Sequence, residues 1–137
     1  CDRSINARRP ERSLVIISDI APKDLKKAGF TTDAAAIEGV LLHLIVVFSG
    51  GCRDHDYTLT MTPAAFMESF PVQANLYLWH DAHDDPCRAI VRDSVVFDLT
   101  PIVELYRRMY GPSGQINLNL HDFGQTESMR LELSATL

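Results

Sequence analysis

The sequence lacks the features that mark several large classes of protein. Its longest apolar run extends only from Val40 to Phe48 and is interrupted by His43, whereas a membrane helix needs about 18 apolar residues. An excess of positive charge is also missing: the formal net charge is −5 and the isoelectric point is about 5.4, which argues against a nucleic-acid-binding domain. The nucleophile elbow, the P-loop, the G-x-G-x-x-G motif and the H-E-x-x-H motif are all absent, so no motif fixes a reaction.

The composition is that of an ordinary globular protein. The 137 residues are 46% hydrophobic and 23% charged, which suits one domain with its own core. Residues 1–12 differ from the rest because they are polar and carry four arginines against Asp2 and Glu11. They therefore indicate a flexible N-terminal tether, followed by a single domain at 13–137.

Short segments of β-type sequence, separated by turn residues, follow from Ser13 onward. Leu14–Ile17 is the first of these expected strands. Glu38–Phe48 is rich in Val, Ile and Leu, while Asp54–Met61 and Val72–His80 alternate between apolar and polar residues. We count about seven such strands, with turns about every 8–12 residues. This pattern predicts a mainly β protein, an antiparallel and immunoglobulin-like β-sandwich, with a partly open β-barrel as the alternative.

One helix is expected, at 101–110. Thr100-Pro101 provides a residue that caps helices and a proline preset for the first helical position. Apolar residues recur from Ile102 to Met109 at helical spacing, and Gly111-Pro112 ends the segment.

The three cysteines divide into one terminal residue and one internal pair. Cys1 comes before the polar tether, whereas Cys52 and Cys87 lie in the β-rich body. This arrangement resembles that of bacterial cell-envelope lipoproteins after maturation, in which the first cysteine carries the lipid. The resemblance implies lipid attachment at Cys1, contact with the membrane through that lipid, and a location at the periplasmic or extracellular face of the envelope.

Each internal cysteine has a histidine nearby in the sequence. Cys52 is followed by His55 after two residues, and His80 and His83 precede Cys87. The alternation places His55, His80 and Cys87 on the apolar sides of their strands, where an unpaired polar group is costly. We therefore expect Cys52, His55, His80 and Cys87 to approach one end of the sandwich.

Two interpretations of this group remain open. In the first, Cys52 and Cys87 form a disulfide, as an oxidising compartment favours; the loop of about 36 residues would stabilise the fold by roughly 4 kcal/mol. In the second, Cys52, His55, His80 (or His83) and Cys87 bind zinc tetrahedrally, and copper also suits such ligands.

Several short segments together resemble a group of uncharacterised, secreted or lipid-anchored bacterial β-proteins. The similar segments are Ser49-Gly50-Gly51-Cys52-x-x-His55, Glu68–Gln73, His80, Asp85-Pro86-Cys87 and Phe97–Pro101. They span just under half of the chain. This resemblance implies the compartment and supplies no activity.

A polar face on the segment Val72–His80 is the remaining candidate for binding. Gln73 and Asn75 alternate onto the same side as Tyr77 and Trp79, a combination that suits a carbohydrate or a partner protein. The sequence thus favours a non-catalytic envelope lipoprotein with a binding or structural role, with a small metal-binding protein as the alternative. An enzyme is less favoured, because no nucleophile can be paired with a base and no residue can be assigned a catalytic role.

Overall fold

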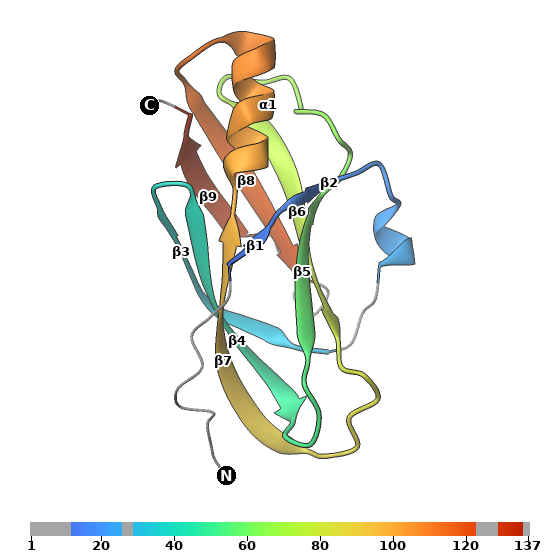
Figure 1. Ribbon diagram of the computed structural model, residues 1–137. Coiled ribbons are helices and arrows are strands. Elements are labelled where there is room, and N and C mark those ends of the chain that lie inside the picture. Colours follow the sequence, from blue (N-terminus) through green and yellow to red (C-terminus); the bar gives the residue numbers. More distant parts are fainter. Residues whose placement is uncertain (1–11, 26–28, 123–128, 136–137) are drawn as a thin grey trace.

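The computed structural model describes residues 12–25, 29–122 and 129–135, which form two facing β-sheets and one α-helix (Figure 1). The strands are β1 (Arg12–Leu14), β2 (Ile16–Ile17), β3 (Thr31–Glu38), β4 (Leu41–Gly50), β5 (Asp56–Met61), β6 (Val72–Asp81), β7 (Ala89–Asp98), β8 (Gln115–Asp122) and β9 (Met129–Ser134). The helix is α1 (Thr100–Tyr110), and a short 3-10 turn covers Pro22–Asp24.

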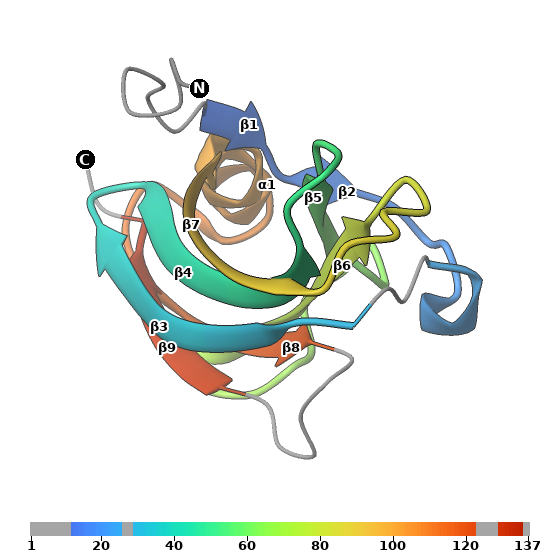
Figure 2. The same ribbon diagram turned by 90° about the horizontal axis from the view of Figure 1, so that it is seen from below.

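The strands divide into a four-stranded and a five-stranded sheet. The first has the order β1-β7-β4-β3 and the second the order β2-β5-β6-β8-β9. Seen from below, β4 and β7 of the first sheet curve around one side of the molecule (Figure 2). The prediction of a mainly β protein with two sheets is therefore confirmed, and the described strands do not close into a barrel.

The pairing is mixed rather than purely antiparallel. Strand β1 runs parallel to β7, β2 parallel to β5, and β6 parallel to β8, while the other neighbours are antiparallel. Strands β6 and β8 are parallel because β7 and α1 lie between them in the sequence. The chain crosses over through these two elements instead of turning back directly. The predicted antiparallel pairing holds for the other four strand pairs, and the three parallel pairs were not predicted.

The core lies between the two sheets, and its contributions from β4 and β6 follow a regular alternation. Every second residue of β6, from Val72 to His80, is buried, and the residues between them are half-exposed. Strand β4 alternates in the same way until Phe48. The largest side chains with almost no exposed surface are Phe97, Leu42, Leu44, Leu59, Met61, Leu76, Leu78, Leu99, Ile102, Ile116, Leu118 and Leu133.

Two segments differ from the sequence-based expectation. Leu14–Ile17 was expected to be one strand, but Val15 is buried between β1 and β2, and the chain passes there from one sheet to the other. The strand expected at Glu38–Phe48 starts later, because Gly39 turns the chain with a φ of 62°. Strand β3, which the sequence did not predict, forms a hairpin with β4 across this turn.

Helix α1 forms where it was expected and lies at one end of the sandwich (Figure 1). Its first turn is not capped by Thr100. Instead, the Asp98 carboxylate accepts hydrogen bonds from the Thr100 backbone N–H (2.9 Å) and hydroxyl (2.6 Å). The helix ends at Gly111, whose φ of 119° suits glycine.

The expected tether lies almost wholly outside the described residues. The structure describes the chain from Arg12, the first residue of β1, so Cys1 and the rest of the tether are not described. Neither helix in the described ranges is long and apolar enough to cross a membrane.

Candidate functional site

The two internal cysteines meet at one end of the first sheet. Strands β4 and β7 are antiparallel neighbours whose last paired residues are Gly50 and Ala89. Cys52 and Cys87 extend this ladder by two residues, their Cα atoms are 5.7 Å apart, and their sulfurs form a disulfide. The chain thus favours the first of the two interpretations of the cysteines.

Asp85 lies at the centre of the same end and binds both cysteine segments. Its Oδ2 accepts hydrogen bonds from the backbone N–H groups of Gly51 (3.1 Å), Cys52 (3.2 Å) and Arg53 (3.1 Å). Its Oδ1 accepts a further bond from the Cys87 backbone N–H, at 2.9 Å. Successive N–H groups that converge on one oxygen form an anion-binding nest, which here holds a side chain of the protein itself.

His55 completes the surroundings of this carboxylate. The distance from His55 Nε2 to Asp85 Oδ2 is 2.7 Å, and the two side chains are only 2% and 0% exposed. The hydrogen bond from His55 holds the pKa of Asp85 well below its ordinary range, assisted by the backbone N–H groups and opposed by burial. Asp85 is therefore an ionised, buried carboxylate at neutral pH.

A second histidine extends the chain of hydrogen bonds into the core. The distance from His55 Nδ1 to His80 Nε2 is 2.6 Å, and His80 is 1% exposed. An ionised carboxylate only accepts, so His55 Nε2 carries a hydrogen and donates to Asp85. His55 Nδ1 and His80 Nε2 share the second bond, so the hydrogen bonds continue from Asp85 through His55 to His80.

Aromatic rings enclose the two histidines. Tyr57 stacks on His80 with ring centroids 4.4 Å apart and an interplanar angle of 4°. Phe48 contacts both imidazoles, at 4.2 Å from His55 and 5.2 Å from His80, and Phe30 meets His80 edge-on at 5.6 Å. Burial raises the pKa of Tyr57, and the negative charge of Asp93 adds to this.

The four residues predicted as a group do lie at one end of the sandwich, but in two linked parts. Cys52 and Cys87 are joined to each other, while His55 and His80 are bonded to each other, and Asp85 connects the two parts. The ligand atoms of Cys52, Asp85 and Cys87 lie within 4.8 Å of one another. A cysteine binds zinc as its thiolate, which a disulfide does not supply, so metal binding through these four residues stays a prediction for the reduced chain.

His83, the alternative fourth ligand, is placed elsewhere. Its ring contacts Asp56 at 2.6 Å and Asp81 at 3.8 Å, and its side chain is 45% exposed. His83 and the adjacent Asp84 both have positive φ, 51° and 55°, which shapes a tight turn between β6 and β7.

Asp85 entered the sequence-based prediction only as part of the segment Asp85-Pro86-Cys87 and was given no role in the site. The spacing Asp85-Pro86-Cys87 does contain a usable signal. An aspartate whose carboxylate accepts from the backbone N–H two residues later is a common local turn motif, and Asp85 makes this bond to Cys87. The three N–H groups of the distant Gly51–Arg53 segment leave no such trace in the sequence.

Comparison with known proteins identifies relatives of the fold and no family. No protein-family model matches the chain, and no curated protein matches it. A NigD-like immunity protein from Bacteroides caccae superposes with a TM-score of 0.60 at 16% identity, over 88% of this chain and 57% of its own. A protein of unknown function from Bacteroides vulgatus gives 0.60 at 13% identity, over 93% of this chain and 58% of its own.

A putative lipoprotein from Bacteroides fragilis is similar over 90% of this chain and 69% of its own, with a TM-score of 0.52 at 11% identity. The chain therefore spans less than two thirds of the length of the first two matches. At these identities, the likeness shows a shared fold.

Proposed function

We propose that the chain is a non-catalytic domain of a bacterial cell-envelope lipoprotein, with a binding or structural role. The observation that carries the proposal is the Cys52–Cys87 disulfide, which ties the ends of β4 and β7 together. Structural disulfides persist in oxidising compartments outside the cytosol and are rare within it. The buried Asp85 carboxylate binds the backbone N–H groups of both cysteines, so this disulfide is a structural part of the fold. A structural disulfide supports a location of the protein in the envelope.

The burial of the Asp85–His55 pair supports a non-catalytic role. A carboxylate that orients an imidazole is the arrangement used for general-base catalysis, but such a base must reach its substrate. Here the two side chains are 0% and 2% exposed, and His80 covers the second nitrogen of His55. The pair thus serves to hold the disulfide end of the sandwich in place.

The proposed anchor is a lipid on Cys1. Its support is the order of the sequence, a cysteine followed by a polar segment and then a folded domain. One protein of similar fold is named a putative lipoprotein, a name that agrees with a role in the envelope. The partner would be a protein or a glycan at the periplasmic or extracellular face.

Lipid attachment can be tested by metabolic labelling. The gene, with its own upstream coding segment, is expressed in bacteria that are fed an alkyne-bearing fatty acid, and label is measured on the purified protein. We expect label on the unaltered chain and on the variant Cys52→Ser/Cys87→Ser, and none on Cys1→Ser. An unlabelled chain, or label that persists in Cys1→Ser, would refute the anchor.

A second candidate function is metal binding by the reduced chain through Cys52, His55, His80 and Cys87. It rests on the spacing of these residues in the sequence, because the disulfide already accounts for the approach of the Cys52, Asp85 and Cys87 ligand atoms within 4.8 Å. Counting thiols in denaturant without reductant, together with elemental analysis for zinc and copper, separates the two candidates. We expect the internal cysteines to yield no thiol and the protein no stoichiometric metal; two internal thiols with one zinc would instead establish the metal site.

A further inference from the structure

The outer face of the five-stranded sheet has an unusual composition along its two central strands. The outward residues of β6 and β8 include no Lys, Arg, Asp or Glu from Gln73 to Trp79 or from Gln115 to His121. They are amides and aromatic rings, placed side by side by the β6·β8 register. We call this surface the amide–aromatic face: Gln73, Asn75, Tyr77, Trp79, Gln115, Asn117, Asn119 and His121.

Three amides of this face, Gln73, Asn75 and Asn119, are hydrogen-bonded to one another across β6 and β8. Asn119 donates from Nδ2 to Gln73 Oε1 (3.0 Å) and Asn75 Oδ1 (3.2 Å). Its own Oδ1 accepts from Arg130 Nε on β9, at 2.9 Å. Asn119 is only 8% exposed although it faces outward, so its neighbours close over it and the polar groups are held in one arrangement.

The aromatic rings are fixed as well. Tyr77 stacks on His121, with centroids 4.6 Å apart and an interplanar angle of 14°. The Trp79 indole donates from Nε1 to Thr60 Oγ1 at 3.1 Å, which ties the ring to β5. Burial lowers the pKa of His121, so its imidazole is neutral at neutral pH and the face carries no charge along these strands.

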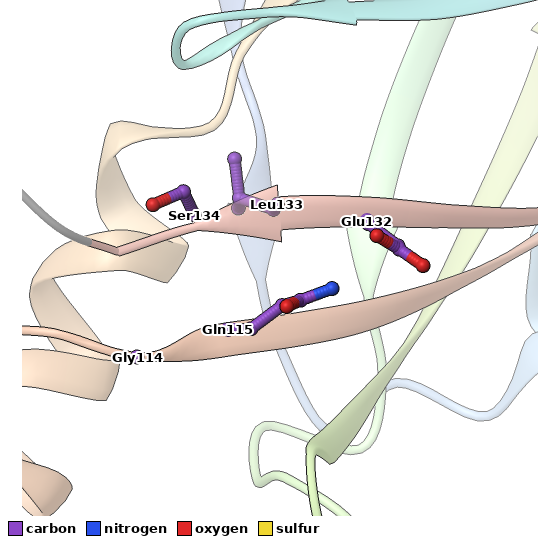
Figure 3. A pocket seen from close by; sticks show the side chains of 5 residues that line it. All are labelled: Gly114, Gln115, Glu132, Leu133 and Ser134. Atoms are coloured by element: carbon purple, nitrogen blue, oxygen red, sulfur yellow. The ribbon is translucent and has the colours of Figure 1, made fainter.

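The same face is hollowed at its far end. A pocket of about 500 Å³ is lined by Gly114, Gln115, Glu132, Leu133 and Ser134 (Figure 3). Figure 3 shows the side chains of Gln115 and Glu132 lying over the space between β8 and β9, and the register places both on the outer face. From Gln115 to His121 the face is about 20 Å long at the usual rise per strand residue, which suits an extended ligand.

From this arrangement we infer that the amide–aromatic face binds a neutral oligosaccharide. Amide side chains offer paired donors and acceptors that match vicinal hydroxyl groups, and aromatic rings such as Tyr77 and Trp79 stack on the apolar faces of sugar rings. Since the side chains are already ordered, binding sacrifices little conformational freedom. The inference rests on the proposed binding role and gives that role a ligand class.

An acidic ligand fits less well, because the outward positions of β6 and β8 carry no cation. The guanidinium of Arg130, on the neighbouring strand β9, is hydrogen-bonded to Asn119. A partner protein is the other occupant of such a face, since Tyr and Trp are also common at protein interfaces. The amides outnumber the aromatic rings on this face, and amides pair well with hydroxyl groups, so the composition favours an oligosaccharide over a partner protein.

The test is affinity electrophoresis of the folded protein in native gels that contain soluble neutral polysaccharides: a β-glucan, an α-glucan, a xylan and a galactomannan. A polygalacturonate gel serves as the acidic arm. We expect at least one neutral polysaccharide to retard the unaltered chain. Tyr77→Ala and Trp79→Ala should weaken this binding by about tenfold or more, as the loss of an aromatic anchor does.

One further measurement and two further variants test whether binding occurs at the amide–aromatic face. Trp79 is the only tryptophan, so its fluorescence in the unaltered chain reports directly on the face when an oligosaccharide fragment of the retarding polymer is added. Ile90→Ala removes an exposed apolar side chain, 79% exposed, from the opposite sheet and should leave both readouts unchanged. Trp79→Phe keeps a flat ring without the bond to Thr60 and should bind with intermediate affinity.

Several results would overturn the inference. These are the absence of retardation in every neutral gel, retardation by the polygalacturonate alone, and a Trp79 signal that does not respond to the fragment. Sedimentation that shows a dimer of the unaltered chain, broken by Trp79→Ala, would assign the face to self-association instead. Failure of lipid labelling would refute the anchor and leave this result standing, so the two proposals fail separately.

Discussion

Replacing Gly50 with alanine should disrupt the Asp85–His55 pair without removing either side chain. A Cβ on Gly50 would lie 2.7 Å from His55 Nε2 and 2.8 Å from Asp85 Oδ2, closer than carbon normally approaches either atom. Those two atoms are 2.7 Å from each other and belong to side chains that are 2% and 0% exposed. The added methyl group therefore displaces one of them and lengthens their hydrogen bond.

The size of the effect follows from the packing. Inserting a methyl group into a well-packed site destabilises by about 1–3 kcal/mol. Against this, alanine restricts the unfolded chain and stabilises by about 0.4–1 kcal/mol. We expect a net loss of about 1–2 kcal/mol, which corresponds to a melting temperature lower by roughly 4–8 °C.

Gly29→Ala is the matched control, because a Cβ there meets nothing within 4 Å. Urea unfolding, followed by the fluorescence of Trp79, measures both variants in the oxidised protein. In the double variant Gly50→Ala/His55→Ala the methyl group has space, so the two changes should be less than additive. If Gly50→Ala is as stable as Gly29→Ala within about 0.5 kcal/mol, the close packing described at this end of the sandwich is incorrect.

Three further predictions concern other contacts of the fold. Cys52→Ala/Cys87→Ala should lower the free energy of unfolding by roughly 4 kcal/mol, measured in urea; a loss below about 1 kcal/mol would show that the disulfide contributes little. Because the pKa of Asp85 is lowered, the stability from its ionised form is present above the ordinary pKa of 3.8 and is lost as the pH falls through the lower folded pKa. Asp85→Asn should flatten this acid limb in urea midpoints recorded between pH 2.5 and about pH 7, and an unchanged limb would contradict the assignment. Arg107 donates from Nε (3.0 Å) and Nη2 (2.8 Å) to the carbonyl of the buried Ala135, so Arg107→Ala should destabilise by about 1–3 kcal/mol in thermal unfolding, whereas Arg108→Ala should not.

The parts of the fold that depend on local alternation could be predicted from the sequence. Val72–His80 alternates without interruption, and the structure buries one half of it as expected. Strand β3 escaped prediction because Ala34–Ala36 has low β-propensity and little amphipathic contrast. It forms because β4 offers it a partner across the turn at Gly39, and tertiary pairing of this kind has no local signal.

The candidate site could be predicted only in part, for a similar reason. The expected Cys52–Cys87 pairing agrees with the structure. The alternation of apolar and polar residues also correctly predicted that His80 faces the core. Asp85 was overlooked because its importance comes from groups that are more than thirty positions away in the sequence, the N–H groups of Gly51–Arg53. Backbone donors carry no residue-type signature, so a nest around a side chain becomes visible only in three dimensions.

Strand β6 connects the disulfide end of the sandwich with the amide–aromatic face. Its inward residues end at His80, which bonds to His55, while its outward residues Tyr77 and Trp79 belong to the amide–aromatic face. A shift of one residue in register would exchange the two sets, so the bond that fixes His80 also fixes which side chains face outward. Asp85→Asn should therefore weaken oligosaccharide binding in proportion to any loosening of β6, although Asp85 lies on the other side of the sheet. Amide hydrogen exchange of β6 in that variant measures the loosening directly, and weakened binding without faster exchange would contradict the coupling.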